Sequence, residues 1–214
     1  MHTIKRNSLL LYAVTDRSWL HGKKLAEEVE KSIRGGVTFV QLREKDLPFD
    51  QFVEQAREVK AVTDYYRIPF VINDNLQVAQ AVDADGIHVG QGDQSPLEIR
   101  KLWGSDKIIG VTAKTVEQAR RAQQEGASYL GVGAAFATST KQDAVTIPRE
   151  RYREITQSVD IPVVAIGGIH AENVLQLRGS GIAGVAVVSA LFAQPDIEKA
   201  ARQLCGLAEQ GIKE

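Results

Sequence analysis

Short apolar runs recur along the whole chain, and a charged stretch follows each of them. The runs are rich in Val, Ile and Leu and are bounded by Gly, Pro, Asp or Asn, which is typical of strands in a parallel sheet that is covered on both faces. We expect eight such strands, at residues 9–15, 38–42, 70–72, 86–89, 107–111, 129–133, 162–166 and 184–188.

The segments between these runs carry apolar residues at the spacing of an amphipathic helix, and most of them end at glycine, a common residue just beyond a helix. The pattern predicts helices over residues 25–33, 52–63, 117–125, 171–178 and 196–209. Strands and helices therefore alternate from one end of the chain to the other.

Eight strand–helix units in 214 residues predict a single-domain (β/α)8 TIM barrel that spans residues 1–214. A doubly wound open sheet is the main alternative, but it normally carries a glycine-rich turn after the first strand. Here that strand ends in Val14-Thr15-Asp16. In a TIM barrel the active site lies at the C-terminal ends of the strands, so the residues at those ends are the candidates for chemistry.

Composition narrows the choice of partners. The chain has 26 basic and 27 acidic residues, a net charge of −1, which gives no long-range attraction to nucleic acid or to an anionic membrane. No apolar run approaches the ~20 residues that span a bilayer, and the single cysteine, Cys205, fits a reducing compartment. We expect a soluble cytoplasmic protein that binds small molecules and neither nucleic acid nor membranes; the sequence leaves a homo-oligomer open.

The end of the second expected strand carries a cluster of donors. Period-two alternation places Gln41, Arg43 and Lys45 on one face, and Leu42 and Glu44 on the other. Two cations and an amide in this arrangement suit an anion with several oxygens, such as a diphosphate. The alternative is a solvated charge run with a structural Arg–Glu pair.

Carboxylates follow the next two strands. Asp74 ends the third and Asp93 follows the fourth, so neighbouring strands deliver them to the same rim of the barrel. Two carboxylates beside a diphosphate site are suited to Mg²⁺, which shares phosphate oxygens and keeps several waters. The alternative assigns Asp74 to a helix N-cap and Asp93 to a loop turn or a cap.

Hydroxyls and glycines mark the last three strand ends. The segment after the sixth strand offers Thr138, Ser139, Thr140 and Lys141, which can wrap a phosphate and neutralise a leaving group. Gly168 follows the seventh strand, while Val188 and Ser189 follow the eighth, at the standard phosphate site of TIM barrels. Glycine for tight packing alone is the alternative. His88 falls within the fourth strand, and we expect it in the core or behind the site.

Seven motifs in order resemble those of thiamine-phosphate synthase, also called thiamine-phosphate pyrophosphorylase, from Tyr12 to Leu191. They are Gln-Leu-Arg-Glu-Lys at 41–45, Asn-Asp at 73–74, Gly-Ile-His-Val-Gly-Gln-Gly-Asp at 86–93, Gly-Val-Thr-Ala-Lys-Thr at 110–115, Thr-Ser-Thr-Lys at 138–141, Ile-Gly-Gly-Ile at 166–169 and Val-Ser-Ala-Leu at 188–191.

The resemblance implies a transferase that joins hydroxymethylpyrimidine diphosphate to hydroxyethylthiazole phosphate, with release of pyrophosphate by a dissociative, Mg²⁺-assisted displacement. It assigns Mg²⁺ to Asp74 and Asp93. The pyrimidine diphosphate would contact Gln41, Leu42, Arg43, Glu44, Lys45, Asn73, Thr112 and Lys141, and the catalytic residues would be Arg43, Lys45, Thr112 and Lys141. The thiazole phosphate would contact Thr138, Ser139, Thr140, Gly168, Val188 and Ser189.

Four positions depart from the common pattern of that family. Thr112 stands where serine is frequent, and Lys114 where histidine is common; Ala134 and Ala137 replace prolines, which predicts a more flexible loop. Two rival functions stay open at this point. One is the related thiazole tautomerase, which has no need for the aspartates, and the other is a non-catalytic barrel that binds thiamine precursors. A barrel isomerase of amino-acid or sugar metabolism is a more distant third.

Overall fold

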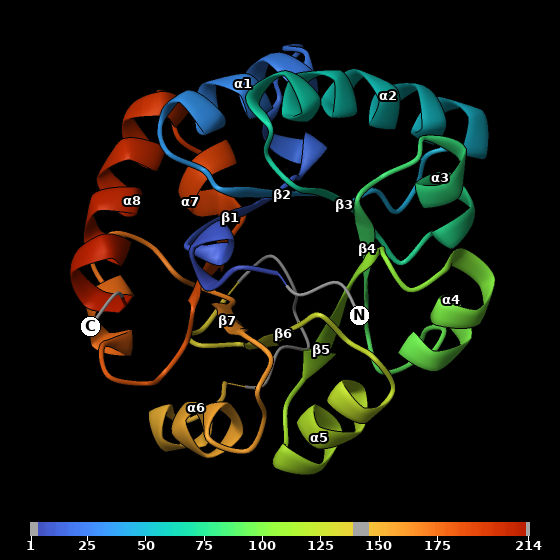
Figure 1. Cartoon of the computed structure of the whole chain (residues 1–214). Helices are drawn as coiled ribbons and strands as arrows, with labels where there is room; N and C mark the ends of the chain where they lie inside the picture. The colour runs from blue at the N-terminus through green and yellow to red at the C-terminus, as the bar shows by residue number, and fades with distance from the viewer. Residues whose placement is uncertain (1–3, 139–145, 213–214) are drawn as a thin grey trace.

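Eight parallel strands close into a barrel in the computed structural model, which describes residues 4–138 and 146–212. Each strand pairs with its sequence neighbours, and β8 pairs with β1 to close the ring (Figure 1). The strands are β1 Leu11–Val14, β2 Phe39–Leu42, β3 Phe70–Asn73, β4 Gly86–Val89, β5 Ile108–Ala113, β6 Tyr129–Gly133, β7 Val163–Ile166 and β8 Gly184–Val187. The single-domain (β/α)8 barrel expected from the sequence is confirmed.

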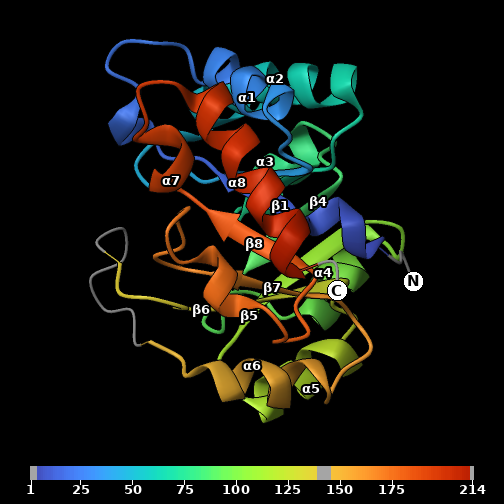
Figure 2. The same ribbon diagram turned by 90° about the vertical axis from the view of Figure 1, so that its left-hand side faces the viewer.

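Helices surround the barrel, with α1 and α2 on the side opposite α5 and α6 (Figure 2). They are α1 Leu25–Arg34, α2 Phe49–Tyr66, α3 Leu76–Ala81, α4 Pro96–Trp103, α5 Val116–Gln124, α6 Arg149–Thr156, α7 Ser189–Phe192 and α8 Ile197–Ile212, with short 3-10 helices η1 Arg6–Leu9, η2 Arg17–Trp19 and η3 Val174–Leu177. Within the described residues, no helix has the length and apolar character to cross a membrane.

The predicted helix over residues 171–178 is wrong, because the structure has only the four residues of η3 there. Asn173 explains the difference. Its side-chain oxygen accepts from the N–H of His170 at 2.9 Å, and its amide donates to the carbonyl of Gly168 at 2.8 Å. A side chain that binds nearby backbone in this way competes with the hydrogen bonds of a helix. Several strand limits also differ from the expected ones by one or two residues; β1, for example, is Leu11–Val14 rather than 9–15, and β5 continues to Ala113 rather than ending at 111.

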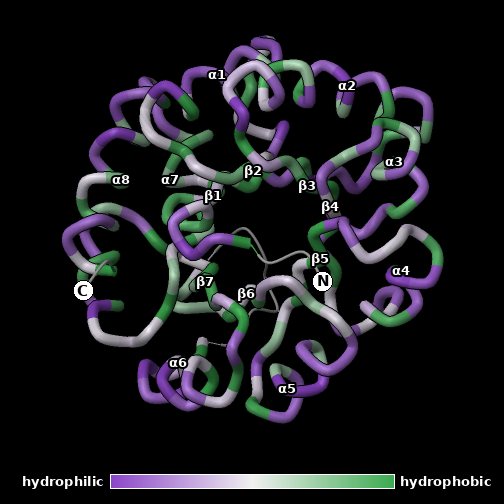
Figure 3. The backbone as a smooth tube through the Cα atoms, viewed as in Figure 1, coloured by the Kyte–Doolittle hydropathy of each residue, from purple (hydrophilic) through white to green (hydrophobic). Residues whose placement is uncertain are grey.

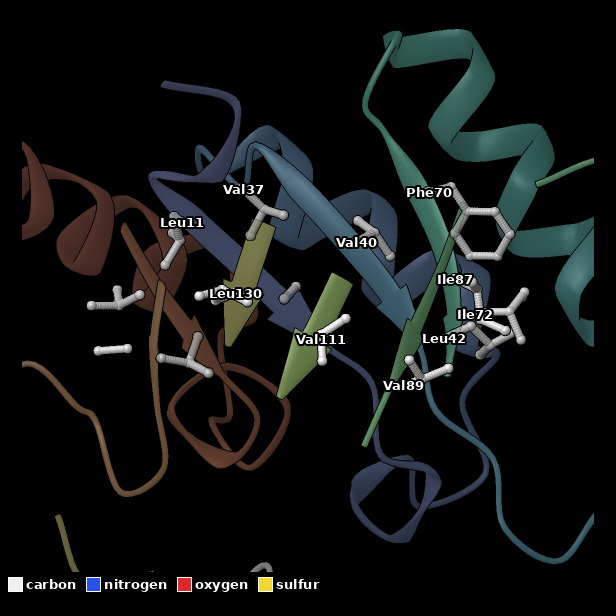
Figure 4. Packing of buried hydrophobic residues seen from close by; sticks show 14 of the residues in the cluster. Leu11, Val37, Val40, Leu42, Phe70, Ile72, Ile87, Val89, Val111 and Leu130 are labelled. Carbon is white, nitrogen blue, oxygen red and sulfur yellow. The ribbon is translucent and has the colours of Figure 1, made fainter. Parts of the chain in front are cut away.

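Alternation along the strands divides the apolar residues into an outer and an inner cluster. The outer cluster fills the space between strands and helices and contains Leu42, Ile72 and Val89 (Figure 4). The inner cluster fills the barrel and contains Tyr12 and Tyr129. The helices of the outer ring carry both hydrophilic and hydrophobic positions along their length, as expected when only one face is buried (Figure 3).

Two glycines make room for large rings inside the barrel. A Cβ atom on Gly110 would lie 2.2 Å from Cζ of Tyr129 and 2.5 Å from Nδ1 of His88, and one on Gly131 would lie 3.0 Å from Cε1 of His88. Even alanine at Gly110 would overlap both rings, so this position needs a residue without a side chain.

Candidate active site

A pocket of about 210 Å³, here called the central pocket, opens at the carboxyl ends of the strands. All eight strands or the loops that follow them contribute to its lining. The lining residues are Val14, Gln41, Arg43, Asn73, His88, Thr112, Lys114, Gly133, Ala134, Thr138, Ile166, Gly167, Gly168, Ile169, Ala186, Val187, Val188 and Ser189.

A second, more open depression of about 750 Å³ lies beside it, and we call it the acidic cleft. Asp74, Asp93, Glu44 and Lys45 line this cleft. Asn73 lines both the cleft and the central pocket, so the two spaces meet at the end of β3. Most of the predicted site residues that the structure describes thus divide between two adjoining regions.

The floor of the central pocket is a row of hydrogen-bonded side chains, here called the polar chain. The amide Nε2 of Gln41 donates to the hydroxyl of Tyr12, which lies 2.8 Å from the hydroxyl of Tyr129. The Tyr129 hydroxyl lies 2.9 Å from Nδ1 of His88, and Nε2 of His88 lies 3.0 Å from Oγ1 of Thr112. The polar chain therefore joins two predicted site residues, Gln41 and Thr112, through three residues that were not among the predicted substrate contacts.

The inner members of the polar chain carry no net charge at neutral pH. Burial lowers the pKa of His88 to about 4, so its imidazole is neutral there. Burial also raises the pKa values of Tyr12 and Tyr129, which keeps both hydroxyls protonated. The expectation for His88 is confirmed in part: it is buried, and its ring also reaches the pocket wall.

The acidic cleft has the opposite character, because the carboxyl groups of Asp74 and Asp93 interact directly. Burial of its carboxyl group and the nearby Asp93 carboxylate raise the pKa of Asp74 to about 6. Asn73 donates its amide to Asp74 at 2.5 Å, and Asp93 accepts from the N–H of Gly90 at 2.7 Å. The parallel strands bring the two aspartates together as predicted.

Of the alternative structural roles, a helix N-cap for Asp74 and a loop turn or cap for Asp93, the structure shows only the loop turn. Asp74 caps no helix, because the side chain of Asn75 caps α3. Its φ of 60° places it in the left-handed region, which aspartate tolerates better than most residues. Asp93 does hold the loop turn at Gly90, whereas Ser95 caps α4.

Residues 41–45, at the end of β2 and just beyond it, place their side chains in three environments. Gln41 and Arg43 line the central pocket and Lys45 lines the cleft. Leu42 is fully buried in the outer cluster, so its side chain does not reach either space. The side chain of Glu44 is 4 % exposed, and its carboxylate accepts from Nε of Arg17 at 2.7 Å. Burial raises the pKa of this carboxyl group. The structural Arg–Glu pair of the alternative interpretation thus exists beside the pocket cations.

Backbone forms the wall of the central pocket after β7 and β8. Gly168 has a φ of +64°, and a Cβ there would lie 2.3 Å from the carbonyl oxygen of Ala137. Close packing therefore requires this glycine, and the same residue lines the pocket. Val188 and Ser189 also line it, and Ser189 begins α7. The first N–H groups of a helix have no partner within the helix, so they can bind an anion.

The loop after β6 contributes Ala134 and Thr138 to the pocket wall. Ser139, Thr140 and Lys141 lie outside the described residues, so their roles stay predictions.

Three comparisons with known proteins decide the family. The family described as thiamine monophosphate synthase matches residues 11–191. The chain belongs to this family. It is 47% identical over 206 residues to a thiamine-phosphate synthase of Clostridium tetani, with 96% of this chain and 98% of that protein covered. A thiamine-phosphate synthase of Ruminiclostridium cellulolyticum is 51% identical over 194 residues, with 91% and 92% covered.

A solved structure supports the same assignment. The thiamine phosphate pyrophosphorylase of Pyrococcus furiosus superposes with a TM-score of 0.88 at 37% identity, covering 96% of this chain and 98% of that one. The thiamine-phosphate synthase resemblance of the seven motifs is thereby confirmed, and the chain is an enzyme of the transferase class.

Proposed function

We propose that this chain condenses 4-amino-2-methyl-5-hydroxymethylpyrimidine diphosphate with 4-methyl-5-(2-hydroxyethyl)thiazole phosphate to give thiamine phosphate and pyrophosphate, as a cytoplasmic enzyme. Membership of the thiamine monophosphate synthase family supports the reaction. The observation that carries the proposal is the meeting of the central pocket with the acidic cleft at Asn73. A substrate that joins an uncharged ring to a diphosphate needs such a pair of spaces.

Mg²⁺ fits the acidic cleft. Two carboxylates in direct interaction repel each other and are suited to share a cation. The described residues hold no group of three or more His, Cys, Asp or Glu side chains that could cage a metal. Mg²⁺ needs no such cage, because one or two carboxylates with phosphate oxygens and water suffice. Asp74 and Asp93 would hold the ion, which would supply positive charge to stabilise the departing pyrophosphate.

Two groups of residues would then share the reaction. Arg43, from the central pocket, and Lys45, from the acidic cleft, bind the diphosphate. Their positive charge stabilises pyrophosphate as the bond between the methylene carbon and the diphosphate oxygen breaks and both electrons go to that oxygen. Lys141 is proposed to bind the leaving group, and Thr112 to hold the pyrimidine. The thiazole nitrogen captures the methylene carbon, which forms the new carbon–nitrogen bond without a protein nucleophile.

The wall after β7 and β8 is proposed to hold the second substrate by its phosphate. Gly168, Val188 and Ser189 line the pocket, and the N-terminus of α7 is close by. Thr138 lines the same pocket, and Ser139 and Thr140 would follow it. Binding two substrates in one pocket, with reacting atoms in line, supplies the proximity that the coupling needs.

The purified protein with both substrates tests the proposal. Thiamine phosphate is followed by thiochrome fluorescence with and without Mg²⁺, beside Asp74→Ala and Lys141→Ala. We expect metal-dependent product that falls about a hundredfold or more in both variants. A folded, Mg²⁺-supplied protein that makes no product would overturn the synthase assignment and favour a tautomerase or a binding barrel.

A further inference from the structure

The three inner members of the polar chain have no part in the reaction proposed above, yet they connect the two ends that reach the pocket. Tyr12 and Tyr129 are 1 % and 0 % exposed, and His88 is 8 % exposed. Burying three polar groups beneath an active site is unfavourable unless each finds a partner, and each does. The polar chain is thus a hydrogen-bonded part of the barrel interior, and the absence of side chains at Gly110 and Gly131 leaves space for its rings.

The order of donors and acceptors along the polar chain follows from its first member. An amide nitrogen only donates, so Gln41 gives a hydrogen to the hydroxyl oxygen of Tyr12. Tyr12 has one hydroxyl hydrogen, and its neighbour along the row is the oxygen of Tyr129, 2.8 Å away. The hydroxyl hydrogen of Tyr129 then goes to the next atom, Nδ1 of His88.

The donor–acceptor order continues in the same direction through His88. A neutral imidazole carries one hydrogen, so a ring that accepts at Nδ1 holds its hydrogen at Nε2. That hydrogen is donated to Oγ1 of Thr112 at 3.0 Å. The hydroxyl of Thr112, which accepts from the ring, keeps its own hydrogen for the pocket.

We propose that Tyr12, Tyr129 and His88 are positioning residues that fix the hydrogen-bond polarity of the pocket, with Thr112 as a donor and the amide oxygen of Gln41 as an acceptor. This inference rests on the proposed function for the identity of the ligand. An aminopyrimidine presents an amino donor beside a ring-nitrogen acceptor, which matches one acceptor and one donor in the wall. A pyrimidinone, which has the reverse order, would leave polar groups unpaired.

The tautomer of His88 tests the direction without any measurement of activity. Histidine labelled with ¹⁵N reports which ring nitrogen carries the hydrogen, and His88→Gln identifies the signal among the four histidines. We expect the Nε2–H form from pH 6 to pH 8. The Nδ1–H form would reverse the chain and overturn the inference. Because this result needs no product, it stands apart from success or failure of the synthase assay.

Tyr129→Phe tests the consequence for the substrate, with Tyr152→Phe as the matched control. Tyr152 is equally buried, and its hydroxyl donates to the carbonyl of Val132 at 3.1 Å, away from the polar chain. We expect Tyr129→Phe to raise KM for the pyrimidine diphosphate about tenfold and to shift the Nδ1 signal of His88, with KM for thiazole phosphate within about twofold of wild type.

The control variant should change neither KM value nor the His88 signal. Equal effects of Tyr129→Phe and Tyr152→Phe, or an unchanged Nδ1 signal in Tyr129→Phe, would contradict a positioning role. If Tyr129→Phe does not fold, the tautomer in the wild-type protein still decides the matter.

Discussion

The central pocket and the acidic cleft meet at Asn73 but differ in the charge and the pairing of their polar side chains. In the pocket floor the inner polar groups are buried, neutral and hydrogen-bonded to one another. In the cleft, the carboxyl groups of Asp74 and Asp93 lie close enough to repel each other when both are charged, and neither forms a salt bridge with any of the described residues. Under the proposed function, this difference would separate recognition of the uncharged pyrimidine ring in the pocket from binding of the diphosphate and Mg²⁺ in the cleft.

Asp74→Asn, in the acidic cleft, should have the largest effect on activity. We expect kcat/KM in the presence of Mg²⁺ to fall about a thousandfold, because the metal loses a charged ligand next to the leaving group. Asp83→Asn is a matched control: Asp83 also has a positive φ, 49° against 60°, but it pairs with Lys107 just before β4 begins. The control should stay within about twofold of wild type.

Thiochrome fluorescence in steady-state assays of both variants measures this contrast. An Asp74→Asn enzyme that keeps a tenth or more of the Mg²⁺-dependent rate would show that the cleft does not hold the metal.

Gly168→Ala should damage the pocket wall and leave the cleft intact. The new Cβ meets the carbonyl of Ala137 at 2.3 Å and forces an L residue to a φ of +64°, so we expect a loss of about 2–3 kcal/mol in the free energy of unfolding. KM for thiazole phosphate should rise about tenfold, since the wall shifts by a fraction of an ångström.

Gly22→Ala separates strain from collision, because Gly22 has a φ of +86° and nothing within 4 Å of the added atom. Urea unfolding should show a loss of only about 1 kcal/mol there. Equal losses in the two variants would mean that the contact with Ala137 has no part in the effect.

The sequence predicts more of the cleft than of the pocket floor. Asp74 and Asp93 follow neighbouring strands, and parallel strands bring their carboxyl ends to one rim, so their meeting could be inferred. Tyr12 and Tyr129 are strand residues that match an ordinary apolar core, and only the structure shows that their hydroxyls meet. Gly110 and Gly131 are the available signal, because a strand position without a side chain makes room for a larger group opposite.

The eight strands could be predicted because each is a short apolar run with clear limits. The helix predicted over 171–178 failed because the pattern does not report that Asn173 bonds to the carbonyl of Gly168. Leu42 shows a related limit: the resemblance places it at the substrate together with its whole motif, and that contact stays a prediction, while the strand turns its side chain into the outer cluster.

Lys114→His, in the central pocket, should have a smaller effect, on KM for the pyrimidine diphosphate. Lys114 lines the central pocket, at a position where the family resemblance leads us to expect histidine. We expect KM for the pyrimidine diphosphate to rise about two- to fivefold at pH 8, where imidazole is neutral, and to approach the wild-type value at pH 6. A KM ratio that does not change between the two pH values would show that the charge at this position does not act on the diphosphate.

The smallest expected effect is on stability without Mg²⁺. The pKa of Asp74 rises from 3.8 to about 6 on folding, so its contribution favours the folded state at low pH and is lost as pH rises from about 4 through 6. Asp74→Asn removes this loss. Its melting temperature relative to wild type should therefore be about 1–2 °C higher at pH 7 than at pH 4. A relative melting temperature that falls over the same range would contradict the raised pKa.

Binding of Mg²⁺ and pyrophosphate, measured by titration calorimetry, tests the division between cleft and pocket most directly. The wild-type protein and Tyr129→Phe should bind pyrophosphate with Mg²⁺ equally well, within about twofold, because the polar chain lies outside the cleft. Asp74→Asn should lose at least about a hundredfold in affinity. If Tyr129→Phe loses pyrophosphate binding and Asp74→Asn keeps it, the two regions do not divide the substrate in the way proposed.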